Sequence, residues 1–379
     1  MRITNKETII FIFIEIFFLT VKKIIFLSIS LGNVFCLNIY IFTQKIKKKK
    51  IILFYHPKEN LTKIHTFYLE KEFKKNKKYK VIFASKIFSP NHFYVKELLL
   101  KYVILVDFFL SNNVSNNFTM NSKKLYMHHD IYDTPLVDFT EENNLKMRLK
   151  KYDYILLPSK KSEYVFRKIF QNEKYKPTLL YLNFYPKLNF LLKKIKFQIK
   201  KLNTVIIAPT NYKSFQGFTI INYIDELIEG LLKLNYKVIY RPHPSNINED
   251  NIKKTYSKFS NCNQFLLDDS TNYLNTYKAS DVMITDMSGT SYTYALLTMK
   301  PVIFFSLNED KITNSYYKEL NFFKDRKKIG KVFYSTKSIL NFLGKKKKFN
   351  NIKKNIENIK RSHFDNKKKS IFDIIDTIL

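Results

Sequence analysis

The sequence predicts an α/β protein with two doubly wound domains, each a parallel sheet with crossover helices. Three observations support this fold class. The short apolar runs are continuous rather than alternating, which is typical of strands buried on both faces. Amphipathic segments separate these runs, and the pattern occurs once before residue 200 and again after it. The length of 379 residues also suits two domains.

The amino-terminal segment, residues 1–50, is predicted to associate with a membrane. Residues 24–42 are uncharged over roughly the length that spans a bilayer, and a lysine cluster at residues 45–50 follows directly. By the positive-inside tendency, this cluster favours a cytoplasmic location for the chain downstream. A true span and an interfacial anchor both remain open, because polar residues such as Asn33 and Asn38 interrupt the run. A cleaved signal peptide and a buried helix are the other interpretations.

The first Rossmann-like domain is expected over residues 51–190. Its predicted strands are residues 51–55, 80–84, 102–106, 124–128 and 154–158. Its predicted helices are residues 61–76, 91–100, 140–150 and 160–170. Strands that alternate with helices in this way form a parallel sheet with right-handed crossovers.

The second Rossmann-like domain is expected over residues 191–350. Its predicted strands are residues 203–209, 237–242, 263–268, 281–286 and 301–305. Its predicted helices are residues 219–234, 271–279 and 290–298, and helices within residues 351–379 are expected to brace both domains. Ligands of open α/β sheets bind beyond the carboxyl ends of the strands, so functional residues are expected in the loops that follow them.

The net charge of +34, from 66 Lys+Arg against 32 Asp+Glu, points to an anionic partner. Arginine, the residue that nucleic-acid readers favour, occurs at only six positions, and the lysine excess is typical of an A/T-rich genome. We therefore expect no nucleic-acid partner, but an anionic membrane surface and phosphorylated ligands. Cys36 and Cys262 are far apart in sequence, which suggests neither a disulfide nor a metal site and fits a reducing compartment.

The first candidate loop, MHHDIYDTPL, follows the strand predicted at residues 124–128. Its functional candidates are His128, His129, Asp130, Asp133 and Thr134. Histidine is well suited to move a proton near neutral pH, and a nearby carboxylate can orient it. The alternative is a polar loop that only caps the next element. A metal site is less favoured, because adjacent residues of an extended segment point in opposite directions.

The second candidate loop is YRPHP, residues 240–244. Arg241 offers the forked donors that suit a phosphate, and the prolines on both sides of His243 fix its backbone. This pattern indicates an anion site, and its alternative is a rigid turn with a surface histidine.

The third candidate loop, TDMSGTSYTYALL, runs from a strand into a helix at residues 285–297. Ser288, Gly289, Thr290 and Ser291 lie where the helix begins, so their hydroxyl and backbone N–H groups can hold a phosphate. The pattern is neither a Walker loop nor a dinucleotide-binding fingerprint. Plain N-capping is the alternative, and it uses the same groups.

The run DVMITDMSGTSYTYALLTMKPVIFF, with YRPHP and VIIAPT before it, resembles the CDP-glycerol:poly(glycerophosphate) glycerophosphotransferases, the family of teichoic-acid primases and polymerases. The resemblance covers scattered blocks of residues 124–305. It implies two Rossmann-like domains that face each other across a cleft in the GT-B arrangement, with no metal or other cofactor. It also implies a location on the inner face of the cytoplasmic membrane. The implied reaction transfers glycerol phosphate from CDP-glycerol to a lipid-linked acceptor and releases CMP.

The resemblance also assigns roles by position. The residues implied to bind the donor diphosphate are Arg241, His243, Asp286, Ser288, Gly289 and Thr290, with Pro209 and Thr210 lining the same site. The family's histidine base falls on His129 or His128. The acceptor loop comprises Asp130, Asp133 and Thr134.

Two departures from the family pattern concern the substrate. Asp130 replaces a glycine after the histidine, and Thr293 replaces an aspartate of the helix start. The transferred group is therefore open between glycerol phosphate and a related polyol phosphate. One alternative is a GT-B glycosyltransferase that uses a nucleotide sugar in capsule or lipopolysaccharide synthesis. Another is a non-catalytic, membrane-tethered nucleotide-binding protein.

The expected mechanism is an attack by an acceptor hydroxyl on the β-phosphorus of the CDP-linked donor. His129 or His128 takes the hydroxyl proton. Arg241, His243 and the helix start at residues 288–290 neutralise the charge on the phosphates.

Overall fold

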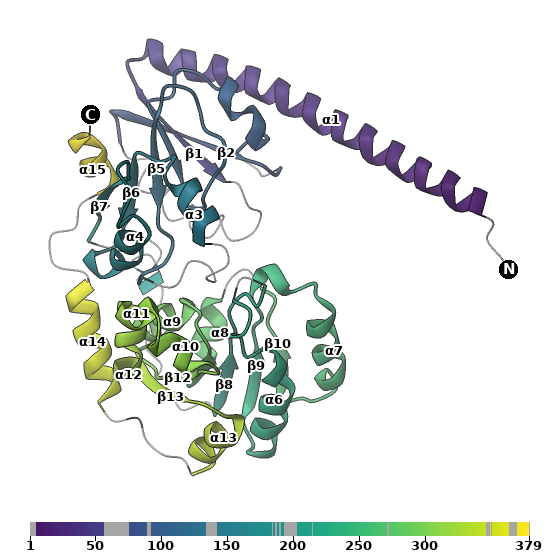
Figure 1. Ribbon diagram of the computed structural model, residues 1–379, viewed down its shortest axis with the longest axis vertical. Helices are drawn as coiled ribbons and strands as arrows, with labels where there is room; N and C mark the ends of the chain where they lie inside the picture. The colour runs from purple at the N-terminus through teal and green to yellow at the C-terminus, as the bar shows by residue number, and fades with distance from the viewer. Residues whose placement is uncertain are drawn as a thin grey trace. The chain divides into compact units, whose positions relative to one another are not determined.

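The computed structural model gives the fold of the chain (Figure 1). It describes residues 5–56, 76–88, 92–133, 142–183, 185, 188, 191–192, 203–213, 215–270, 273–345, 349, 351–363 and 370–378. The helix predicted at residues 61–76 lies almost wholly outside the described residues, as does Thr134.

The first sheet has seven strands in the order β3-β2-β1-β4-β5-β6-β7. The strands are β1 (Lys50–His56), β2 (Tyr79–Ser85), β3 (Phe93–Tyr94), β4 (Phe108–Ser111), β5 (Lys123–Met127), β6 (Tyr154–Leu157) and β7 (Thr178–Tyr181). The register pairs Tyr55 of β1 with Ala84 on one side and Ser111 on the other, in parallel. The strand order reverses between β1 and β4, which is where such sheets bind ligands.

The second sheet has six strands in the order β10-β9-β8-β11-β12-β13, which repeats the order of the first. The strands are β8 (Thr204–Ile207), β9 (Lys237–Tyr240), β10 (Phe265–Leu267), β11 (Val282–Thr285), β12 (Val302–Phe305) and β13 (Gly330–Phe333). Strand β8 pairs in parallel with β9 and β11, so the order of this sheet reverses between β8 and β11. Two parallel α/β sheets of this kind confirm the predicted fold class.

Two compact units make up the chain. One holds α1 and strands β1 to β4 and extends to Tyr126, and the other begins at Met127 and continues to the carboxyl terminus. The domain limits expected at residues 190 and 350 stay predictions.

The first unit contains α1 (Asn5–Ile46) and the 3₁₀ helix η1 (Glu97–Tyr102). The helices that follow are α3 (Glu142–Leu149), α4 (Tyr164–Ile169), α6 (Ile224–Lys233), α7 (Asp250–Phe259), α8 (Leu274–Ala279), α9 (Thr290–Thr298), α10 (Glu309–Thr313), α11 (Asn321–Lys324), α12 (Arg326–Ile329), α13 (Thr336–Gly344), α14 (Ile352–His363) and α15 (Ile371–Thr377). Short 3₁₀ turns include η3 (Lys160–Ser162) and η5 (Pro244–Asn246).

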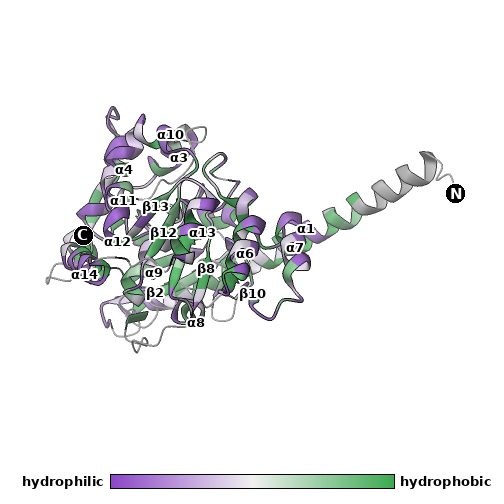
Figure 2. Ribbon diagram, turned by 90° about the horizontal axis from the view of Figure 1, so that it is seen from below, coloured by the Kyte–Doolittle hydropathy of each residue, from purple (hydrophilic) through white to green (hydrophobic). Residues whose placement is uncertain are grey.

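The core of the second sheet follows from its sequence pattern. Strands β8 and β11 are buried at every position, as their continuous apolar runs predict. Helix α6 buries Ile224, Leu227 and Leu231, which recur at the spacing of one helix face. Figure 2 shows the contrast between the core strands and a surface helix: β8 and β12 are hydrophobic, and α14 is largely hydrophilic.

The strand predicted at residues 102–106 is wrong. The neighbouring strand of the sheet is instead β4 (Phe108–Ser111), and residues 102–106 end η1 and continue as a loop. The α-helix predicted over residues 91–100 is also wrong, because β3 and η1 occupy its described part. Both runs are apolar and short, and a pattern of this length does not distinguish a strand from a loop or a turn.

Candidate functional site

The carboxyl edge of the second sheet is held together where β8 and β11 end. Thr285 Oγ1 donates to the Ala208 carbonyl at 2.6 Å. The Asp286 carboxylate accepts the backbone N–H of Thr210 at 2.8 Å and that of Ile220 at 3.1 Å. Asp286 therefore fixes the loop after β8, and its contacts here are to the backbone.

Burial governs the protonation of Asp286. The carboxyl is 4% exposed, and burial raises its pKa to about 6 although the backbone N–H donors act in the opposite direction. Asp286 therefore positions the loop that carries Pro209 and Thr210. The predicted role of Asp286 toward the donor diphosphate stays a prediction.

Arg241 lies at the end of β9, next to the end of β10. Its Nη1 donates to Asp268 at 2.6 Å and its Nη2 to the Ser270 carbonyl at 2.9 Å. Burial alone would raise the pKa of Asp268, but hydrogen bonds from Ser270 and Thr276 and the Arg241 charge hold that pKa below its ordinary value. The guanidinium has five N–H groups, so these two contacts do not use all of its donors.

His243 begins the 3₁₀ turn η5. Its Nδ1 accepts the backbone N–H of Ser245 at 3.2 Å. A neutral His243 therefore carries its proton on Nε2, which makes that atom a hydrogen-bond donor. This is the form required to bind a phosphate oxygen.

The start of α9 follows Asp286 directly. Gly289 is the N-cap, and no side chain caps this helix. Ser288 accepts the Ser291 N–H through its carbonyl, and the Thr290 hydroxyl hydrogen-bonds the hydroxyl of Tyr277. Within the described residues, the amino-terminal N–H groups of α9 thus have no capping side chain, an arrangement that can accept an anion.

Two buried polar groups lie beside this edge: Ser291, which the sequence places at the predicted helix start, and Asn246, which the sequence did not indicate as a site residue. The Ser291 hydroxyl is fully buried, the Asn246 amide is 2% exposed, and neither has a hydrogen-bond partner within the described part of the chain. Buried polar groups without partners are costly in a finished fold, and they are expected where a ligand supplies the partner. Asn246 follows His243 by three residues, so its position just after YRPHP was the sequence feature that could have indicated it as a site residue.

The histidine loop after β5 separates the two candidate bases. His128 is 1% exposed, its Nε2 lies 3.1 Å from the Tyr132 carbonyl, and burial lowers its pKa to about 4. His129 and Asp130 are partly exposed, and the His129 carbonyl accepts the Tyr185 hydroxyl. Of the two histidines, His129 is therefore the one that a substrate can reach.

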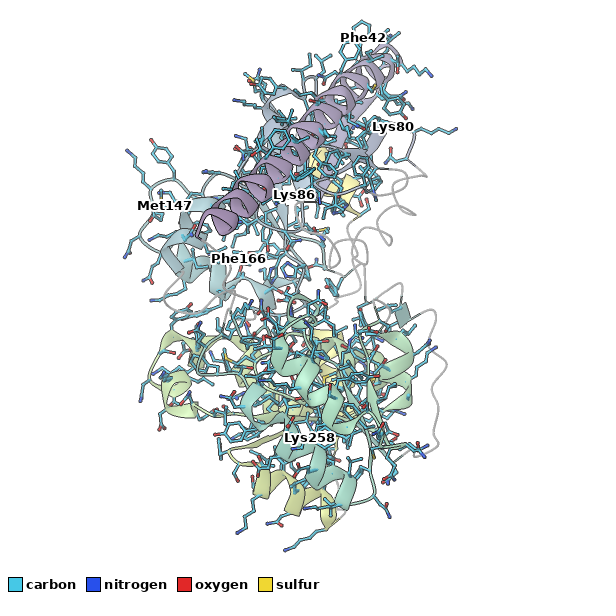
Figure 3. The ribbon with its side chains drawn as sticks, turned by 90° about the vertical axis from the view of Figure 1, so that its right-hand side faces the viewer. Phe42, Lys80, Lys86, Met147, Phe166 and Lys258 are labelled. Atoms are coloured by element: carbon cyan, nitrogen blue, oxygen red, sulfur yellow. The ribbon has the colours of Figure 1, made fainter. Side chains whose placement is uncertain are left out.

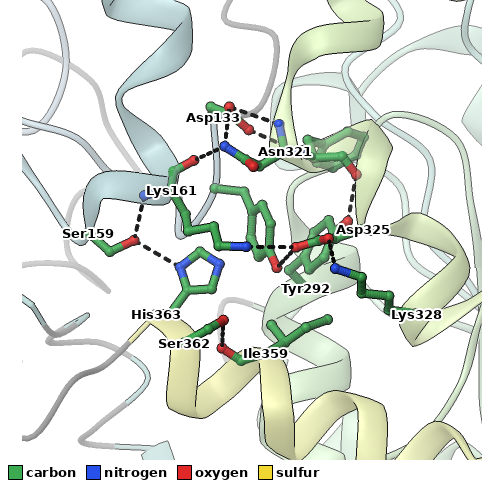
Figure 4. Close-up of polar contacts among 12 residues, drawn as sticks. Asp133, Ser159, Lys161, Tyr292, Asn321, Asp325, Lys328, Ile359, Ser362 and His363 are labelled. Atoms are coloured by element: carbon green, nitrogen blue, oxygen red, sulfur yellow. Dashed lines mark hydrogen bonds and ion pairs between the residues drawn. The ribbon is translucent and has the colours of Figure 1, made fainter.

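Asp133, assigned to the acceptor loop, lies in a buried polar network (Figure 4). Its carboxylate accepts the Asn321 N–H at 2.9 Å, the Asn321 amide at 3.1 Å and the Phe322 N–H at 2.8 Å. Burial raises its pKa to about 6. Asp133 thus ties the histidine loop to the start of α11.

The same network continues through Asp325. The Tyr132 hydroxyl donates to Asp325 at 2.9 Å, and Lys161 and Lys328 lie 3.6 and 2.7 Å from the same carboxylate. Ser159 and the Nδ1 of His363 are 2.9 Å apart. These contacts join the end of β6, the histidine loop and α14 in one network (Figure 4).

No group of three or more His, Cys, Asp or Glu side chains among the described residues is arranged to hold a metal ion. The donors that the edge of the second sheet offers to an anion are N–H and hydroxyl groups.

Comparisons with solved structures identify the fold. The wall teichoic acid polymerase TagF matches with a TM-score of 0.54 and 18% identity over 84% of each chain. A putative UDP-N-acetylglucosamine 2-epimerase from Listeria monocytogenes matches with a TM-score of 0.56 and 11% identity over 85% of this chain and 98% of that one. The UDP-GlcNAc 2-epimerase of Neisseria meningitidis matches with a TM-score of 0.54 and 11% identity over 81% and 94% of the two chains. The fold is therefore GT-B-like.

Comparison with curated proteins gives no match. The family model described as CDP-Glycerol:Poly(glycerophosphate) glycerophosphotransferase matches residues 38–375, which is nearly the whole chain. This match includes both sheets and all three loops discussed above. The chain therefore belongs to the CDP-glycerol:poly(glycerophosphate) glycerophosphotransferase family.

Proposed function

We propose that this protein transfers glycerol phosphate, or a related polyol phosphate, from a CDP-linked donor to a lipid-linked cell-surface polymer and releases CMP. The observation that carries the proposal is the edge between β8 and β11. There the start of α9 and the buried Ser291 hydroxyl, which have no capping side chain and no hydrogen-bond partner among the described residues, lie next to the loop that Asp286 holds in place. Fixed N–H and hydroxyl donors at such a switch point suit the diphosphate of a nucleotide donor.

The donor diphosphate binds at this edge. The N–H groups at Ser288, Gly289 and Thr290 face the developing charge, and Nε2 of His243 donates a further hydrogen bond. Arg241 supplies positive charge from a position fixed by Asp268. Pro209 and Thr210 line the same edge in the loop that Asp286 holds.

His129 acts as the general base toward the acceptor hydroxyl. It is partly exposed, whereas His128 is buried in a form that burial keeps neutral. His128 orients the loop through Tyr132, and Asp133 fixes the loop at its other end. The hydroxyl oxygen attacks the β-phosphorus, its proton passes to His129, and CMP leaves with the bridging oxygen.

The reaction takes place at the cytoplasmic face of the cell membrane, to which α1 anchors the protein. The segment Ile16–Ile46 is long and apolar enough to cross a membrane by its length and composition. An anchor at this position keeps the enzyme close to a lipid-linked acceptor.

Product analysis tests the proposed donor. Membranes of the source organism provide the acceptor, and CDP-glycerol, CDP-ribitol, UDP-sugars and GDP-sugars are offered separately. We expect release of CMP from a CDP-polyol. Release of UDP or GDP from a sugar would instead identify a glycosyltransferase, and nucleotide binding without turnover would identify a binding protein.

Variants test the proposed site. We expect Ser291→Ala and His243→Ala each to lower the rate of CMP release by about 10²-fold, since each removes a donor to a charged group. Ser257→Ala, on the exposed side of α7, is the matched control and should leave the rate unchanged. A rate within a few-fold of the parent in both site variants would disprove the assignment.

A further inference from the structure

An apolar loop of the first unit lies on the surface. In η1 and the loop that follows it, which together we call this loop, Leu98, Tyr102, Ile104 and Leu105 are 52%, 52%, 49% and 48% exposed. The sequence is apolar enough to predict a buried strand, yet the structure leaves these side chains in solvent. Large apolar side chains exposed side by side indicate an interaction surface.

The backbone of this loop is held by α1. The Asn38 amide donates to the Tyr102 carbonyl at 2.9 Å, and its oxygen accepts the Ile104 N–H at 3.0 Å. The Ser30 hydroxyl accepts the Lys96 N–H at 2.7 Å. One polar side chain of the helix thus satisfies two backbone groups of the loop. In a strand, the neighbouring strands of the sheet satisfy such groups, so this loop has its partners without joining the sheet.

Helix α1 has two different faces over its carboxyl-terminal half. Ser30, Val34, Leu37 and Ile41 recur at helical spacing, and each is at most 5% exposed, so this face packs against the first unit. The opposite face presents exposed apolar side chains at Ile24, Ile25, Ile29, Leu31, Phe35, Ile39, Phe42 and Ile46. Figure 3 shows Phe42 near the end of the helix, pointing outward.

The loop and the helix face adjoin each other. Asn38, which binds the loop, has Phe35 and Phe42 as its neighbours three residues before and four residues after it on the helix. We use the name outer apolar surface for the exposed face of α1 together with Leu98, Tyr102, Ile104 and Leu105.

Leu105 supports a role for this surface. Its φ of 60° lies in the left-handed region, which a leucine rarely adopts. About half of its side chain is exposed, so packing inside the unit does not offset the cost of that conformation. A strained residue that displays an apolar side chain to solvent is expected where a partner receives the side chain.

The charged residues around this surface indicate which kind of partner it fits. The two carboxylates nearest to the loop in sequence already have partners: Glu97 accepts the Ser115 hydroxyl at 2.8 Å, and Asp107 pairs with Lys45 at 2.6 Å. The lysines adjacent in sequence to residues of this surface are Lys22, Lys23, Lys47, Lys48 and Lys101. An apolar surface bordered by lysines, with a tyrosine at its edge, suits the interfacial region of an anionic bilayer.

We propose that the outer apolar surface is embedded in one face of an anionic lipid bilayer, so that α1 and the loop at residues 98–105 bind the membrane as one unit. The anchor is therefore more than the amino-terminal helix, because the body of the first unit contacts the lipid as well. This inference is independent of the transfer reaction, since it concerns binding to lipid alone.

Fluorescence of a single tryptophan tests the proposal, because the chain contains no Trp. The full-length Leu105→Trp variant is mixed with phosphatidylglycerol vesicles that contain lipids brominated in the acyl chain. We expect a blue shift and quenching, since bromine quenches only tryptophan that enters the acyl region. The control is Leu266→Trp in β10, which is 56% exposed and should show neither change.

Three results would overturn the proposal. The first is vesicle binding of Leu105→Trp without quenching, which would leave α1 as the whole anchor. The second is a blue shift without vesicles together with dimers in sedimentation, which would show that a second copy of the chain covers the surface. The third is equal quenching of the Leu266→Trp control.

Substitutions in the loop give a second test. Replacing Leu98, Tyr102, Ile104 and Leu105 by serine should weaken vesicle binding at least about tenfold, because apolar area no longer enters the lipid. All four side chains are half-exposed, so the unfolding midpoint should not fall. Asn38→Ala should reduce quenching of Trp at position 105, whereas Asn33→Ala, whose amide bonds only Ile29 of the same helix, should not. Unchanged vesicle affinity in the serine variant would contradict the proposal.

Discussion

The two sheets share one strand order but stabilise their carboxyl edges in opposite ways. The edge of the second sheet contains fixed charges, with Arg241 on Asp268 at 2.6 Å and Asp286 on two backbone N–H groups. At the first sheet, His56 ends β1 and His128 follows β5, and burial lowers their pKa values to about 3 and 4. The ends of β1 and β5 thus carry neutral histidine rings, with charged groups of the Asp133 and Asp325 network beyond them, whereas the second edge carries an ion pair and oriented donors at the strand ends themselves.

This difference matches what the proposed reaction requires of each edge. A diphosphate arrives with its own negative charge, and donors that are already fixed need no reorganisation to meet it. An acceptor hydroxyl is neutral and has to lose a proton, so a neutral imidazole is the suitable group beside it. The fold is repeated, and the chemistry of the edges differs.

Removing the proposed base should have the largest effect on the first edge. We expect His129→Ala to lower the rate of CMP release by about 10²-fold or more, since general-base catalysis contributes about that factor. The measurement is the rate with a CDP-polyol and a lipid acceptor, and added imidazole should restore part of it. A rate close to that of the parent would show that His129 is not the general base.

At the second edge, Asp286→Ala should mainly reduce stability. Two buried backbone N–H groups lose their acceptor, at a cost of about 3 kcal/mol in the free energy of unfolding. Urea denaturation measures this value, and Asp269→Ala on the exposed surface should change it by no more than about 0.5 kcal/mol. A loss below about 1 kcal/mol in Asp286→Ala would mean that the loop after β8 is held by other contacts.

The pH dependence of stability should separate the contribution of His56 from that of Asp286. The folded pKa of His56 lies below its unfolded value of about 6.5, so the unfolded chain binds the proton first and stability falls as the pH falls below 6.5. The folded pKa of Asp286 is raised from 3.8 to about 6, so its contribution has the opposite sign and stability falls as the pH rises from about 4 to about 6.

Single variants isolate these contributions. His56→Phe should reduce the loss of stability between pH 6.5 and pH 5 by up to about 1.4 kcal/mol per pH unit, the value for one proton. Both ring nitrogens of His56 are buried without a partner within the described residues, so phenylalanine fits the site chemically. An unchanged slope between pH 6.5 and pH 5 would contradict the proposed protonation.

The smallest effect is expected for an ion pair outside both edges. Lys213 and Glu249 are 2.5 Å apart, and their side chains are 59% and 31% exposed. Lys213→Ala should leave the midpoint of urea unfolding close to that of the parent, because solvent screens an exposed ion pair, and added salt should reduce any remaining change. A larger, salt-independent effect would show that charge stabilises this protein away from the edge as well.

Strand position was predictable wherever an apolar run was buried. Residues 204–207 and 282–285 are examples, because nothing but a central strand accommodates them. Residues 102–106 have the same composition, and the prediction failed there because Asn38, more than 60 positions earlier, binds their backbone. The local sequence pattern gives no information about such a long-range contact.

The candidate site was predictable as a set of loops but not as a set of contacts. Sequence alone could not rank His128 and His129, because the difference is burial behind Phe166 and Tyr132. The partner of Arg241 is 27 residues away, on another strand. Asn246 is recognised only when the structure shows a buried amide that lacks a partner among the described residues, and the same observation distinguishes Ser291 from the other hydroxyls predicted at the start of α9.

For the proposed membrane attachment and lipid-linked acceptor, the packed face of α1 also affects the thermodynamics of the encounter between enzyme and acceptor. A helix docked along about half its length restricts the rotation of the unit that it carries. The translational and rotational entropy of association with a lipid-borne substrate is then lost once, when the protein reaches the membrane, and not at every encounter. The enzyme then searches for its acceptor by diffusion in two dimensions. The effective concentration of the acceptor is set by its density in the leaflet.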